Sequence, residues 1–178
     1  MTGTNPTGTA LTELTMRALA EGIRTRALSA EEVVAAHLER IEEVNPTLNA
    51  IVSLRAEEAL DEARELDALS ARGISRGPLH GIPMAVKDLM DVAGVRTTHG
   101  SRIYADHVAT ADSVIVSKMR EAGAVFVGKT NVPDFGVGLP TFNEVFVVTR
   151  HPLSTSLLGG GRGGGACPVV PTLLRSPV

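Results

Sequence analysis

The residues of this chain best suited to chemistry are Lys87 and Asp88, which come directly after an apolar segment. Residues 82–86 have the length and branched side chains of a buried strand. Pro78 and Pro83, with a glycine between them, predict a turn before that strand. Burial disfavours the charged form of a lysine, so Lys87 is a candidate for a neutral, proton-accepting amine. The alternative is a lysine that extends its ammonium into solvent, with Asp88 as its partner.

Two glycine-containing motifs could instead bind a nucleotide. Residues 123–130 fit the phosphate-loop pattern, and residues 159–164 fit the dinucleotide fingerprint. A phosphate loop needs a strand before its first glycine and a helix after its Lys-Thr pair. Here a helix is predicted before it, and Pro133 follows it; Pro168 and Pro171 likewise exclude a helix after the second motif. A nucleotide-binding protein is therefore a disfavoured alternative.

Metal chemistry has no support in the sequence. No two histidines have metal-ligand spacing on a predicted helix, and Cys167 is the only cysteine. We therefore predict no metal and no other cofactor. A Ser–His–Asp triad is also disfavoured, because no serine stands in a nucleophile-elbow sequence.

Helices are expected before the strand that ends at Lys87. One is predicted over residues 11–26, and another starts at Ser29, where Glu32 completes a capping box, and ends at Asn45-Pro46. An extended segment, residues 48–54, leads to a third helix over residues 56–71, with Gly73 as its C-terminal cap.

A short helix and a second strand are expected after Lys87. Asp112 is predicted to cap a helix whose inner face holds Ile115, Met119 and Ala122, and residues 124–127 form the strand. Strand, crossover helix and strand make a parallel α/β pattern, and such folds place their sites at the strand ends. Lys87 lies at such an end.

The composition limits the kinds of partner that this chain is expected to bind. The 178 residues are 43% hydrophobic and 21% charged, with a net charge of −3 and no basic run. We therefore expect a globular chain that binds neither nucleic acid nor a membrane. No signal peptide is recognisable, and with one cysteine a cytoplasmic protein is the simplest inference.

Residues 77–88, with residues 91–94, 97–98 and 100–101, resemble the opening block of the amidase signature family. These are serine hydrolases that cleave amide bonds with a Ser–Ser–Lys triad. The resemblance continues through residues 122–135 and 149–152 in the family's order, and runs from about residue 14 to 165. It implies the N-terminal portion of an α/β fold, a mixed sheet flanked by helices, with Lys87 as the catalytic lysine. It also implies that Asn131, Pro133 and Phe135 shape the fold around the site.

The glycine-rich run departs from the family pattern, which has two serines between glycines. Aligned on the glycines, the first serine, which relays a proton in the family, falls on Gly161, and its neighbour falls on Arg162. The remaining candidates for a substrate loop are Gly159, Gly160 and Gly163. The family's nucleophile belongs to a later motif of the Gly-Thr-Asp-x-Gly-Gly-Ser type, which does not occur in these 178 residues.

These observations predict an amidase-family hydrolase in a truncated, inactive form. Residues 1–10 are expected to be a disordered tail and residues 11–165 the N-terminal part of an amidase domain. Residues 166–178, with three prolines, are expected to be an aberrant tail produced by a frameshift. The partner would be a small-molecule amide, and the chain could form a homo-oligomer. The alternative is a pseudoenzyme that acts as a binding or regulatory module.

Overall fold

The computed structural model describes residues 8–152 and 154–159. The helices are α1 (Gly8–Glu13), α2 (Met16–Arg24), α3 (Ala30–Leu48), α4 (Ala56–Ala71) and α5 (Val114–Glu121), with short 3-10 turns at Arg102–Tyr104 and Asp134–Gly136. The strands are β1 (Ile51–Leu54), β2 (Pro83–Lys87), β3 (Val125–Thr130), β4 (Phe142–Asn143), β5 (Val147–Val148), β6 (Arg150–His151) and β7 (Ser154–Leu158). Every helix in these two segments is too short or too polar to cross a bilayer.

The central sheet has the strand order β1-β3-β2. Strand β2 runs parallel to β3, with α5 in the connection between them, and β1 is antiparallel to β3. The predicted parallel pair is therefore confirmed, and the sheet is mixed, as expected for the fold class. The carboxyl ends of β2 and β3 lie at the same edge, which places Lys87 beside Thr130.

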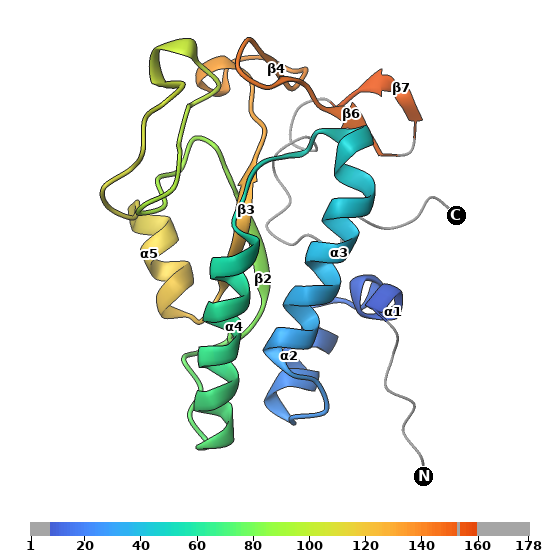
Figure 1. The fold of residues 1–178 in the computed structure, drawn as a ribbon, viewed down its shortest axis with the longest axis vertical. Coiled ribbons are helices and arrows are strands. Elements are labelled where there is room, and N and C mark those ends of the chain that lie inside the picture. The colour runs from blue at the N-terminus through green and yellow to red at the C-terminus, as the bar shows by residue number, and fades with distance from the viewer. Residues whose placement is uncertain (1–7, 153, 160–178) are drawn as a thin grey trace.

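Helices cover both faces of this sheet. On one face α3 and α4 pack side by side against β2 and β3, around a core that includes Ile41, Leu66 and Val127 (Figure 1). On the other face α2 and α5 pack against Met84, Phe126 and the segment after β2. The small hairpins β4-β5 and β6-β7 lie at the end of the molecule where β2 and β3 finish (Figure 1).

Local signals correctly predict two of the helices. Ser29 Oγ accepts a hydrogen bond from the Glu32 amide at 3.0 Å, and Glu32 Oε2 accepts one from the Ser29 amide at 2.9 Å, so the capping box is confirmed. Helix α4 spans the predicted residues. Gly73, at φ +76°, follows its last turn, and the Ile74 amide donates to the Leu69 carbonyl at 3.0 Å. A left-handed glycine with this bond is the usual way to end a helix.

Two predicted helix boundaries are wrong. The helix expected over residues 11–26 is two helices, because Thr15 Oγ1 accepts from the Ala18 amide at 3.2 Å and starts α2. Pro46 does not end α3, which continues to Leu48. A proline this near the end removes one helical donor. The Asn45 side chain binds the chain beyond the helix end by accepting from the amides of Ala50 and Ile51 at 2.9 and 2.8 Å.

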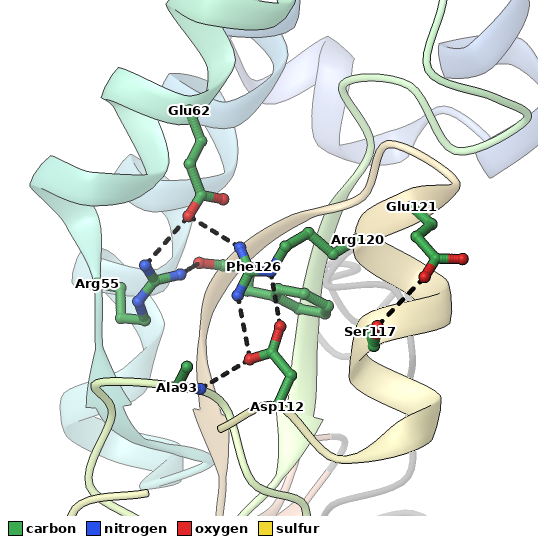
Figure 2. A network of polar contacts seen from close by, with 8 residues as sticks. All are labelled: Arg55, Glu62, Ala93, Asp112, Ser117, Arg120, Glu121 and Phe126. Atoms are coloured by element: carbon green, nitrogen blue, oxygen red, sulfur yellow. Dashed lines mark hydrogen bonds and ion pairs between the residues drawn. The ribbon is translucent and has the colours of Figure 1, made fainter. Parts of the chain in front are cut away.

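The prediction that Asp112 caps α5 is also wrong. Helix α5 starts after Ser113, and Asp112 Oδ1 accepts from the Ala93 amide at 2.7 Å while Oδ2 lies 2.8 Å from Arg120 Nε (Figure 2). The hydrogen bond from Arg120 lowers the pKa of Asp112. The inner face differs too, because Val116 is fully buried while Ile115 is 46% exposed.

This ion pair belongs to a network that joins three elements. Arg120 also lies 3.3 Å from Glu62 on α4, and Glu62 lies 3.1 Å from Arg55. Arg55 in turn donates to the Phe126 carbonyl on β3 at 2.9 Å (Figure 2). Half-buried pairs that share partners lose less side-chain entropy per contact than isolated surface pairs do. The network therefore fixes α4 and α5 relative to the strand between them.

A bulge in β3 decides where the residues after it point. Met84 pairs with Phe126 but Ala85 pairs with Gly128, so Val127 is an extra residue in β3. An extra residue reverses the alternation of side chains beyond it. Strand β1 approaches the bulge so closely that a Cβ on Gly128 would lie 2.3 Å from the Ser53 carbonyl oxygen. Only glycine fits there.

We therefore predict that Gly128→Ala destabilises the chain by about 3 kcal/mol, because the backbone of β1 must move away from the new methyl group. Urea denaturation followed by circular dichroism measures this. Gly94→Ala is the matched control: a Cβ there meets nothing within 4 Å and adds only the strain of φ +75°, about 1 kcal/mol. Equal losses for the two variants would contradict the close approach at Gly128.

Candidate active site

Lys87 is the last residue of β2 and is half-buried, as its position after an apolar strand predicts. Its carbonyl accepts from the Met90 amide at 2.9 Å, which makes a tight turn directly after the strand. Within residues 8–152 and 154–159, nothing forms a hydrogen bond or an ion pair with the Lys87 ammonium. In these segments the structure therefore presents an amine on a fixed backbone with no carboxylate bound to it.

Asp88 is fully buried and does not pair with Lys87. Its Oδ2 accepts from the Thr98 amide at 3.0 Å and from the Thr98 hydroxyl at 2.5 Å. Its Oδ1 lies 3.4 Å from the ammonium of Lys129. The alternative in which Asp88 is the partner of Lys87 is therefore wrong.

Lys129, on β3, is the lysine that the structure buries completely. Its ammonium donates to the Met90 carbonyl and to the Thr97 hydroxyl, both at 2.7 Å. Burial lowers the pKa of Lys129, and the nearby Asp88 and Asp91 carboxylates oppose that shift. Sequence reasoning missed this residue because the predicted strand stops at residue 127, whereas β3 continues past Gly128 to Thr130 and includes Lys129.

Lys129 also excludes the phosphate loop. The Gly128-Lys129-Thr130 part of the pattern lies inside strand β3 and is fully buried or nearly so. Its ammonium already binds protein oxygens, and no loop surrounds it. The nucleotide-binding alternative therefore has no structural basis in these residues.

The segment after Lys87 is attached to β3 at several points. The Asp88 amide donates to the Thr130 carbonyl and the His99 amide donates to the Asp88 carbonyl, both at 3.0 Å. The Phe135 amide donates to the His99 carbonyl at 2.8 Å, and the Phe135 and Tyr104 rings contact the His99 ring. Backbone and rings together hold this segment against the strand ends.

Asn131 organises the other side of the strand ends. It is fully buried, and its Nδ2 donates to the Thr149 hydroxyl at 3.0 Å. Its Oδ1 accepts from Asn143 Nδ2 at 2.7 Å. Thr149 in turn donates to the Asn49 carbonyl at 2.7 Å. Asn131 therefore connects the end of β3 to the hairpins and to α3, in agreement with the expected scaffolding role.

The glycine-rich run is described only at its first residue. The Gly159 amide donates to the Thr149 carbonyl at 2.7 Å, and the Gly159 carbonyl accepts from the Thr141 amide at 2.8 Å. These bonds bring the start of the run next to the Asn131 network. Gly160, Gly161, Arg162 and Gly163 lie outside the described residues.

In the part of the chain that the structure describes, potential metal ligands lie apart from one another. Within the described segments, histidine, cysteine, aspartate and glutamate side chains do not gather in groups of three that could hold an ion. His80 illustrates why: its Nδ1 accepts from the Arg76 amide at 3.0 Å, and its Nε2 lies 3.2 Å from the Leu66 carbonyl. Both ring nitrogens of His80 are therefore engaged with the backbone of the fold.

The buried charge of Lys129 gives a pH dependence of stability. Its folded pKa is lowered from the ordinary 10.5, so between the lowered value and 10.5 the unfolded chain binds more protons. The free energy of unfolding therefore rises with pH in that window, and the full cost of burying the charge is present below it. Urea denaturation across this pH range, in the wild type and in Lys129→Met, measures the effect. We expect the wild type to gain stability relative to the variant as pH approaches 10.5, and a constant difference would contradict the shift.

Comparison with known proteins identifies the family of this arrangement. The family model for amidases matches residues 32–172. A subunit of the glutamyl-tRNA(Gln) amidotransferase of Moorella thermoacetica is 43% identical over 157 residues, which are 88% of this chain and 32% of the relative. The chain thus spans about a third of the length of the curated relatives that it matches.

Solved structures of amidases resemble the fold of this chain. A bacterial aryl acylamidase of the amidase signature family superposes with a TM-score of 0.82 at 31% identity, over 88% of this chain and 33% of the other. A chain of the inhibitor-bound vestigial complex that reveals the origins of an s-triazine catabolic enzyme gives a TM-score of 0.84 at 34% identity, over 90% of this chain and 36% of the other. The family-model match, the curated relative and the solved structures lead to one conclusion: the chain belongs to the amidase signature family.

Proposed function

We propose that this chain is the lysine-bearing part of an amidase signature hydrolase and that Lys87 is its proton acceptor. The observation that carries the proposal is the place of Lys87, half-buried at the carboxyl end of a parallel strand pair, with no carboxylate partner among the described residues. This edge is where parallel α/β sheets usually place their sites. A general base must be free to take up a proton, and no carboxylate among the described residues is bound to the Lys87 amine.

The reaction would proceed through an acyl-serine. Lys87 takes a proton, through the family's relay serine, from the nucleophilic serine, whose oxygen attacks the carbonyl carbon of the amide. The C–N bond breaks, the leaving amine takes up the proton, and an ester to the serine remains. Water then hydrolyses the ester to a carboxylic acid and regenerates the serine. The proposal is limited to carboxylic amides, since the names of the relatives indicate different substrates.

Within these 178 residues the proposal assigns the lysine alone. Gly161 occupies the relay position and has no hydroxyl, and the family's nucleophile motif does not occur in the sequence. Truncation, inactivity, the aberrant tail at 166–178, a cytoplasmic location and a homo-oligomer remain predictions from the sequence. Gly161 is also the observation that favours the second candidate, a pseudoenzyme that keeps the scaffold as a binding module.

We predict that the purified 178-residue chain does not hydrolyse simple amides, because lysine alone supplies neither a nucleophile nor an oxyanion hole. Ammonia release from small amides measures this, and Lys87→Ala should leave any trace rate unchanged. A turnover that disappears with Lys87→Ala but persists with Lys118→Ala would contradict the assignment of Gly161.

A chimera tests the role of Lys87 directly. Residues 11–158 of this chain would replace the matching part of the Moorella thermoacetica relative, and the rest of that protein would supply the family's two serines. We predict an active chimera, in which Lys87→Ala lowers kcat by about a thousandfold, the usual size of a general-base contribution. Lys118→Ala, on the exposed face of α5, is the matched control. If the folded Lys87→Ala chimera kept full activity, Lys87 would not be the proton acceptor.

A further inference from the structure

The residue next to the proposed base is an aspartate, and this creates an electrostatic problem. A carboxylate near an amine favours its protonated form. A protonated Lys87 could not accept a proton, so an unpaired Asp88 would work against the function proposed above. The side chain of Asp88 therefore needs another partner.

The structure supplies hydrogen bonds to one carboxylate oxygen of Asp88 and an ion pair to the other. Thr98 donates its amide and its hydroxyl to Oδ2, at 3.0 and 2.5 Å. The Lys129 ammonium lies 3.4 Å from Oδ1. Asp88, Thr98 and Lys129 are all fully buried, so solvent screens this attraction little. The negative charge of Asp88 is thus compensated inside the protein.

Lys129 is held in place independently of Asp88. Its ammonium also donates to the Met90 carbonyl and the Thr97 hydroxyl, both at 2.7 Å. Met90 closes the turn that starts at Lys87, since its amide donates to the Lys87 carbonyl at 2.9 Å. Asp91 is the other carboxylate that acts on Lys129. One side chain therefore fixes the turn after Lys87 and lies against the carboxylate within that turn.

We infer that Lys129 is a positioning residue, which neutralises Asp88 and holds that carboxylate away from Lys87. This inference rests on the proposed function for its purpose. The electrostatic relation between the three side chains can nevertheless be measured without any catalysis. The β3 bulge contributes to it, because the bulge places Lys129 opposite Val86, one residue before Lys87.

Competitive labelling of amines tests the inference on the whole 178-residue chain. The chain has only three lysines, at positions 87, 118 and 129. Acetic anhydride at mildly alkaline pH reacts only with neutral amines, and peptide mass spectrometry gives the rate at each lysine. Lys118, 68% exposed on α5, serves as the internal reference.

We expect Lys129→Met to slow the labelling of Lys87 about tenfold relative to Lys118, because the released Asp88 carboxylate favours the protonated amine. Adding Asp88→Asn to that variant should restore the wild-type rate. A merely structural role for Lys129 would not be rescued by removing a second charge. Unchanged labelling of Lys87 in the folded Lys129→Met variant would overturn the inference.

Lys129→Met could fail to fold, which circular dichroism would reveal, so a milder variant completes the test. Thr98→Val frees Asp88 from its hydroxyl contact and should also slow the labelling of Lys87, with rescue by Asp88→Asn. If labelling of Lys87 stays slow when Asp88→Asn is added, the Asp88 carboxylate is not the cause of the slowing, and the inference is overturned.

Failure of this inference is distinguishable from failure of the proposed function. The labelling rates report on charges near Lys87 whether or not Lys87 takes part in a reaction. The chimera reports on the reaction whatever the reason for the reactivity of the amine.

Discussion

The contact between the Lys129 ammonium and the Asp88 carboxylate, 3.4 Å apart and closed to solvent, is the interaction on which the site depends. A buried pair of charges contributes little net stability, because desolvation of both ions offsets most of their attraction. Removing one partner is far more costly, since it leaves an uncompensated charge inside. Such a pair therefore favours one conformation of the chain over others, and adds little to the free energy of unfolding. Here it specifies the turn after Lys87.

That pair exists only because β3 contains a bulge and β1 lies close to it. The extra residue at Val127 changes which face the following side chains occupy, and Gly128 allows the Ser53 carbonyl to approach. Without the bulge, Lys129 would be directed to the opposite face of the sheet, away from Asp88 and the Met90 carbonyl. Gly128, which has no side chain, thus determines where the charged side chain of Lys129 lies. The position of the charged groups in this site therefore depends on the backbone geometry of β3.

The sequence predicts those features that depend on near neighbours. The Ser29–Glu32 capping box, the Gly73 cap, the bounds of α4 and the strand that ends at Lys87 each follow from a few adjacent residues, and each is confirmed. The prediction that Asp112 caps α5 is wrong because its carboxylate forms an ion pair with Arg120, near the end of the same helix. That ion pair outweighs a helix cap. The prediction at Pro46 is wrong because α3 continues to Leu48, and the Asn45 side chain binds the amides of Ala50 and Ile51 beyond that end. The burial of Lys129 depends on a bulge and on Thr97, 32 residues away, which local patterns do not contain.

Under the proposed function, the two lysines of the sheet divide two tasks that one side chain could not perform together. A lysine that neutralises Asp88 must be enclosed beside it, as Lys129 is. A proton acceptor must be able to lose its charge and must reach its substrate, which requires partial exposure, as at Lys87. Adjacent positions on paired strands allow both, because the pairing brings Lys129 beside Val86 and leaves Lys87 beside Thr130. The Asp88 carboxylate pairs with the enclosed Lys129, and Lys87 keeps the partial exposure that the proposed reaction requires.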